Sequence, residues 1–214
     1  MSNIFPFRIH FTKEGKLRFL SHHDLMRTFE RALRRTELPL RFTEGFNPHP
    51  HISFPTALGI GIESFDEIAE VELTSWIAPK QIEIRINMQM PEGIKIKSVE
   101  PFDRKNRSVI EFVEYDAKFL KPMQDFLKGI NTRIDNFLKT PEVILERQSD
   151  KGTKLIDVRK YALAITLNGD TISLKIKITD SGTAKPEEVL KALGIEVPSP
   201  DIRITKARTE IGRR

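Results

Sequence analysis

The apolar residues follow strand-like and helix-like spacing in the same order in both halves of the chain. This order restricts the folds that the chain can adopt. In the first half, apolar residues alternate in FPFRIHF as in a strand and then repeat at helical spacing over residues 21–36. Further strand patterns follow in LRFT, HISFP and DEIAEVELTSW, around the turn-forming GFNPHP. A second helix is expected over 79–88, although its isoleucines also alternate as in a strand, and IKIKSVEP closes a β-α-β-β-α-β order.

The same order returns after the polar segment 102–108. A strand is expected in IEFVEYD, a long amphipathic helix over 118–139, a strand in VILERQS and a hairpin from YALAITL to ISLKIKI. A short helix in KPEEVLKALG and a last strand in DIRITKARTEI complete the pattern. We therefore expect an α+β protein of two tandem ferredoxin-like (β-α-β-β-α-β) domains with antiparallel sheets, over residues 1–103 and 108–214.

Composition excludes several classes of function. The 214 residues include no cysteine, which excludes disulfides, thiolate-bound zinc and iron–sulfur clusters. No apolar run approaches ~18 residues, and the N-terminal segment lacks the pattern of a signal peptide. We expect a cytoplasmic protein that has no membrane contact and no cofactor.

The first predicted helix has an arginine-rich side. The net charge of +5 favours anionic partners only weakly, so the position of the charge matters more than its sum. Arginine suits phosphate because its planar fork donates two parallel hydrogen bonds. Two alternatives stay open here, a solvated surface and a nucleic-acid contact, and for the second we single out Arg18, Arg27, Arg31, Arg34, Arg35 and, from the following loop, Asn47.

Four of the five histidines flank this helix. His22 and His23 lie at the start of the helix, whose free N–H groups favour anions, and His49 and His51 lie in the loop after it. If that loop folds over the N-terminal end of the helix, histidines from both pairs would share one anionic pocket. In the simplest alternative they are loop residues bonded to the backbone.

Two kinds of chemistry are compatible with such a pocket. His22 and His49 would be the general base and general acid of a phosphodiester cleavage, because the pKa of histidine lies near neutrality. A metal is the weaker alternative, since the spacing does not place two ligands on one helical face, and no metal site is expected. Asn47 either stabilises a turn before Pro48 or contacts a base edge, and Phe42 and Phe46 could stack on bases.

In the second half, KLIDVRKYA contains polar residues at alternating positions. Its alternation places Asp157, Arg159 and Tyr161 on one face of a strand. A structural ion pair and contact with a partner are the two interpretations.

The stretch FLSHHDLMRTFERALRRTELPLRFTEGFNPHPHISFPTALGIGIES resembles the radical-SAM-linked domain of unknown function, which occurs C-terminal to, or is encoded beside, a cobalamin-binding radical SAM enzyme. IDVRKY and KPEEVLKAL extend the resemblance over nearly the whole chain. The family pattern matches at Ser21, His22, Asp24, Arg27, Arg31, Ala32, Arg34, Arg35, Leu38, Pro39, Gly45, Phe46, Asn47, Pro48, His49 and Pro50.

The resemblance implies partners more than a reaction. It implies association with a radical SAM and cobalamin-binding protein, and its gene neighbourhood implies RNA or a ribosomal component as a further partner. A chain without cysteine has no Cys-x3-Cys-x2-Cys motif and cannot perform radical SAM chemistry alone.

Three functions are therefore considered. The first is a non-catalytic RNA-binding or substrate-presenting module that works with a radical SAM enzyme. The second is a small metal-independent RNA-processing endonuclease with His22 and His49 as the acid–base pair. The third is a protein-interaction module that docks on the radical SAM enzyme through the arginine-rich helix.

Overall fold

The computed structural model describes residues 3–103, 109–121, 129–149, 152–197 and 199–212. The chain divides into two compact units, with the boundary between Val109 and Ile110. Each unit has its own buried apolar side chains.

The first unit is a sheet with two helices. Its elements in chain order are β1 (Phe5–Lys13), the 3-10 helix η1 (Gly15–Phe19), α1 (His22–Arg34), β2 (Ile52–Ser53), β3 (Glu63–Leu73), α2 (Pro79–Asn87) and β4 (Ile94–Pro101). Antiparallel pairing gives the local order β2-β3-β1-β4. The helix α2 confirms the helical interpretation of 79–88, and Pro79 is at its first turn, where its missing N–H costs nothing.

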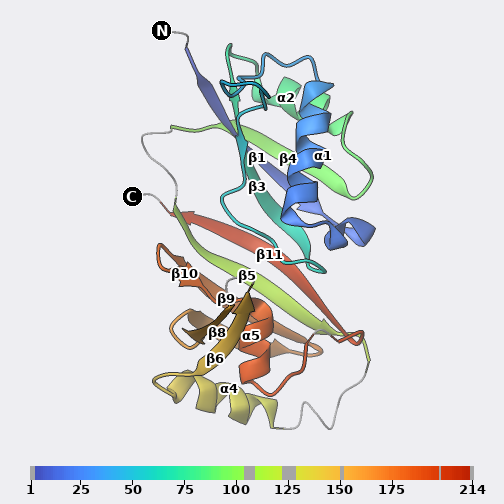
Figure 1. The fold of residues 1–214 in the computed structure, drawn as a ribbon. Helices are drawn as coiled ribbons and strands as arrows, with labels where there is room; N and C mark the ends of the chain where they lie inside the picture. Colours follow the sequence, from blue (N-terminus) through green and yellow to red (C-terminus); the bar gives the residue numbers. More distant parts are fainter. Residues whose placement is uncertain (1–2, 104–108, 122–128, 150–151, 198, 213–214) are drawn as a thin grey trace. The chain divides into compact units, whose positions relative to one another are not determined.

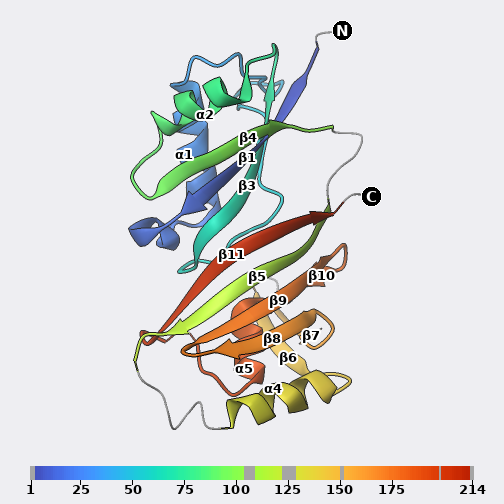
Figure 2. The same cartoon turned by 180° about the vertical axis from the view of Figure 1, so that it is seen from behind.

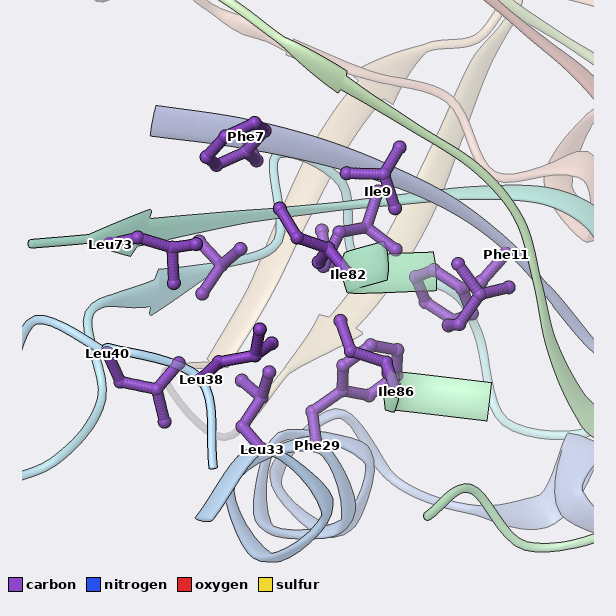
Figure 3. Close-up of a cluster of buried hydrophobic side chains, with 14 of the residues drawn as sticks. Phe7, Ile9, Phe11, Phe29, Leu33, Leu38, Leu40, Leu73, Ile82 and Ile86 are labelled. Atoms are coloured by element: carbon purple, nitrogen blue, oxygen red, sulfur yellow. The ribbon is translucent and has the colours of Figure 1, made fainter. Parts of the chain in front are cut away.

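The core of this unit lies between the sheet and the helices. Figures 1 and 2 show α1 and α2 on the same face of β1, β3 and β4. Alternate residues of β1 point to this face, as expected for a strand, and meet the apolar side of α1. Figure 3 shows the cluster, which includes the fully buried Phe7, Ile9, Phe11, Phe29, Leu33, Leu73, Ile82 and Ile86.

The segment between α1 and β3 follows β3 in two pieces. Pro39 and Leu40 pair with the end of β3 through the hydrogen bond from the Thr74 N–H to the Pro39 carbonyl and a bridge to Leu73. β2 then pairs with β3 further along, at Val71 and Glu70. Residues 42–50 leave this pairing as an excursion, so the two strand patterns predicted on either side of GFNPHP are short pieces beside one partner.

The second unit contains more strands than helices. Its elements are β5 (Val109–Phe119), α4 (Ile130–Lys139), β6 (Ile144–Ser149), β7 (Gly152–Asp157), β8 (Ala162–Asn168), β9 (Thr171–Thr179), β10 (Gly182–Thr183), α5 (Pro186–Ala192) and β11 (Ile202–Gly212). β9 pairs antiparallel with β5, β8 and β10. β6 and β7 pair only with each other.

The prediction of two tandem ferredoxin-like domains is wrong. The fold is mixed α+β, but in the second unit β9 pairs with β5, β8 and β10, β6 and β7 form a separate two-stranded sheet, and the described residues of both units contain four α-helices. The long helix expected over 118–139 is also wrong at its start, because β5 continues to Phe119 and α4 begins at Ile130; residues 122–128 lie outside the described residues. Hydrophobic period identifies a strand but does not identify its pairing partner, so the tandem pattern was compatible with several sheets.

Polar anchors hold the second unit together. Arg159 lies in the turn after β7, and its guanidinium donates to the Leu138 carbonyl at 2.9 and 3.1 Å and to the Ala162 carbonyl at 2.8 Å. Asp157 accepts the backbone N–H groups of Val143 and Arg159. The IDVRKY motif therefore ties β7 to the end of α4, which is a structural use of these residues.

A second anchor joins β6 to α5. Arg147 donates to both carboxylate oxygens of Glu188 at 2.6 Å and to the Thr183 carbonyl at 2.9 Å. Burial would raise the pKa of Glu188, but the hydrogen bond and charge of Arg147 and the N–H of Lys185 outweigh it and hold that pKa below its usual range. The pair therefore stabilises the folded chain while the carboxyl is ionised.

Candidate nucleic-acid interface

The arginine face of α1, which we define as Arg27, Arg31, Arg34 and Arg35, is exposed along the C-terminal part of the helix. The helix begins after Ser21, whose hydroxyl accepts the Asp24 N–H at 3.1 Å, and its apolar side is buried in the core. Because the apolar side of α1 packs on the core, the arginines on the opposite side of the helix face outward.

Two members of the arginine face have little or no internal partner. The Arg27 side chain is 71% exposed, and its guanidinium lies 4.0 Å from Asp24, the outer limit of an ion pair. The Arg31 side chain makes no hydrogen bond or ion pair within the part of the chain that the structure describes. These two guanidinium groups keep their donors available for an external anion.

The other two members hold neighbouring segments. The Arg34 Nη2 donates to the Pro48 carbonyl at 2.6 Å, and its guanidinium lies over the Phe42 ring, 5.1 Å from the centroid. Arg35 donates to the side chain and the carbonyl of Gln89 at 3.0 and 2.8 Å. Both have a positioning role in addition to any contact with a ligand.

Arg18 lies outside α1 and is half-buried. Its guanidinium is 3.3 Å from Glu63 and lies over the Phe19 ring at 4.6 Å. Its carbonyl accepts the Gly61 N–H. The charge of Arg18 is therefore opposed by a carboxylate, unlike that of Arg31, and its predicted contact with nucleic acid stays a prediction.

The GFNPHP motif forms the tip of a short hairpin, which we call the motif hairpin (residues 41–51). The Thr43 N–H donates to the His49 carbonyl at 2.8 Å, the His49 N–H to the Thr43 hydroxyl at 3.0 Å, and the His51 N–H to the Arg41 carbonyl at 2.8 Å. Gly45 has a φ of +126°, which favours glycine, and starts the turn. The five tip residues 44–48 are all exposed, including Asn47.

The motif hairpin is anchored on two sides. At its base, the Arg41 N–H donates to the Glu72 carbonyl at 2.8 Å and the Arg41 side chain pairs with the Glu72 carboxylate at 2.6 Å. The Glu72 N–H donates in turn to the His51 carbonyl. Near the tip, Arg34 binds Pro48, so the tip lies at the C-terminal end of α1 and not at the N-terminal end that the sequence suggested.

His22 and His49 have different neighbours. The His49 Nδ1 lies 3.7 Å from a Glu30 carboxylate oxygen, whereas the His22 ring packs edge-on against Phe54 at a centroid distance of 5.8 Å and against His23 at 6.1 Å. Residues 22 and 30 are eight apart in the helix, or roughly 12 Å along its axis. These contacts do not bring His22 and His49 together, and the acid–base pair stays a prediction.

The two aromatic residues of the motif hairpin differ in exposure. Phe42 is 39% exposed and is covered by Arg34, whereas Phe46 at the tip is 106% exposed, as open as in an isolated residue. Their sequence contexts gave no signal that separates them. The tip therefore presents one free aromatic ring and the Asn47 amide next to the arginine face.

Two negative findings concern the described ranges. They contain no group of three or more histidine, aspartate or glutamate side chains placed to hold a metal ion. They also contain no helix long and apolar enough to cross a membrane.

The fold and this surface define an α+β protein with a basic helix and an anchored hairpin. Residues 7–208 match a family described as "Uncharacterized protein conserved in bacteria (DUF2344)", and the chain belongs to that family. No curated protein matches the chain. The family description assigns no activity.

Proposed function

We propose that this protein is a non-catalytic RNA-binding module that presents RNA or a ribosomal component to a radical SAM and cobalamin-binding enzyme. The observation that carries the proposal is the exposure of Arg27 and Arg31 beside a hairpin that presents Asn47 and Phe46. The enzyme partner follows from the sequence resemblance.

Electrostatics supports a polyanionic ligand. The segment from His22 to Arg35 contains four arginines and only two carboxylates, Asp24 and Glu30, so its net charge is positive. Basic side chains in the last turn also stabilise the helix dipole, but Arg27 lies two turns before the end of α1 and gains nothing from it. A row of arginines spanning about 12 Å of helix suits a chain of phosphates better than a single small anion.

The experiment measures binding of purified protein to total cellular RNA over a salt series. We expect affinity to fall steeply with salt, and the double substitution Arg27→Ala and Arg31→Ala to reduce the log–log slope by about one to two, since each phosphate contact contributes roughly 0.7 to 0.9. The matched control replaces Lys139 and Lys191, exposed lysines of α4 and α5, because it removes the same charge elsewhere.

Three results would count against the proposal. Absence of binding at low salt would remove RNA as a ligand. Equal losses from the two double substitutions would indicate binding to net charge alone. Discrete cleavage of the RNA, abolished by His22→Ala, would favour the endonuclease instead.

A further inference from the structure

Phe46 is the most exposed large apolar side chain among the described residues. Exposure of a phenyl ring to water is unfavourable, and phenylalanine side chains are usually buried. A single exposed ring needs no explanation by itself. At this position, however, the hairpin that carries the ring is anchored at its stem and base.

The motif hairpin holds Phe46 away from the core. Its stem is closed by hydrogen bonds between Thr43 and His49, its base is bonded to Glu72 of β3, and Arg34 binds the Pro48 carbonyl. These contacts leave the tip little freedom to fold back. The hairpin therefore keeps the ring exposed, where a ligand can cover it.

The neighbours of Phe46 identify the kind of ligand. The other tip residues are exposed. Glu44 and Asn47 are polar, and Gly45 and Pro48 are small, so the tip has no contiguous apolar patch of the kind that forms the centre of a protein interface. A lone ring beside guanidinium groups and an amide suits a nucleobase, which offers an apolar face and a polar edge.

We infer that the ligand of the arginine face is an unpaired RNA strand and that Phe46 stacks on one of its bases. This inference rests on the proposed function and narrows it. In an RNA duplex both faces of each base are already stacked, so the ring would find no free surface. Arg27 and Arg31 bind the backbone phosphates, and the Asn47 amide, which both donates and accepts, contacts the edge of the stacked or neighbouring base.

The test compares one fluorescein-labelled 12-nucleotide RNA as a single strand and as a duplex with its complement. Fluorescence anisotropy at low salt gives both dissociation constants. We expect the single strand to bind at least tenfold more tightly, and Phe46→Ala to weaken single-strand binding about tenfold while duplex binding is unchanged. Phe46→Trp should keep the affinity and show quenching of its added fluorescence on binding.

The matched control is Phe65→Ala, which removes another exposed phenyl ring of the same unit, on β3. It should leave both affinities unchanged. Because Phe46 makes no buried contact, circular dichroism should show that Phe46→Ala folds normally.

The outcomes separate the inference from the proposed function. Equal binding of single strand and duplex, unaffected by Phe46→Ala, would overturn the inference, while salt-sensitive binding that depends on Arg27 and Arg31 would leave the proposed function standing. Absence of binding to either RNA would overturn both. Loss of association with the radical SAM enzyme in Phe46→Ala, with RNA affinity intact, would assign the ring to a protein contact.

Discussion

Replacing Arg34 by alanine removes two contacts that hold the motif hairpin against α1. One is the hydrogen bond to the Pro48 carbonyl at 2.6 Å, and the other is the stacking of the guanidinium over Phe42 at 5.1 Å. Both are exposed to solvent, so we take about 1 kcal/mol for the hydrogen bond, the central value for an uncharged pair, and about 0.5 kcal/mol for the cation–π contact, the low end of its range. The tip should therefore open about tenfold more often.

Amide hydrogen exchange measures this opening directly. The Thr43 N–H, which is bonded to the His49 carbonyl, should exchange about tenfold faster in Arg34→Ala. The His51 N–H at the base should change less, because Glu72 also anchors it. Arg31→Ala is the control, since Arg31 has no internal partner within the described ranges.

Unchanged exchange at Thr43 in Arg34→Ala would refute the idea that Arg34 anchors the hairpin. The same would follow if Arg31→Ala accelerated the exchange equally. If the expectation is met, a loss of RNA affinity in Arg34→Ala reports the position of the tip, whereas a loss in Arg31→Ala reports a phosphate contact.

Two further predictions concern stability. Gly93 (φ +95°) and Gly61 (φ +88°) are equally strained for alanine, but a Cβ on Gly93 would meet the Glu14 carbonyl at 2.8 Å, and one on Gly61 meets nothing, so Gly93→Ala should lower the Tm more than Gly61→Ala in thermal unfolding. Because the pKa of Glu188 is depressed when folded, its pairing with Arg147 stabilises the chain above the unfolded pKa of about 4.3 and is lost as pH falls through the folded value. In Glu188→Gln, the free energy of unfolding measured with urea should therefore decrease less steeply below about pH 5 than in the unchanged protein. An unaltered pH profile would contradict this.

Local elements were predictable because short-range spacing determines them. The helix α1 follows from its Ser21 cap and its apolar positions, and α2 from Pro79. The strand partners were not predictable. The pairing of β6 with β7 alone, and the division of the segment beside β3 into two pieces, depend on contacts between residues far apart in the chain.

The candidate site shows the same division. The outward direction of the arginine face follows from the helical pattern, as does the exposure of Arg31. No local pattern indicates that Arg34 binds Pro48 or that Arg18 pairs with Glu63, since both partners are distant in the chain. The sequence also does not indicate that Phe42 is less exposed than Phe46, because this difference arises from the position of Arg34.

The way in which the motif hairpin leaves β3 has a consequence for engineering. The hydrogen bond from the His51 N–H to the Arg41 carbonyl closes the excursion at its base, and the pairing of both flanking pieces with β3 is complete without residues 42–50. The length and composition of the tip can therefore vary without changing the register of the sheet. Under the proposed function, grafting other residues at 44–47 is a route to altered base preference on an unchanged scaffold.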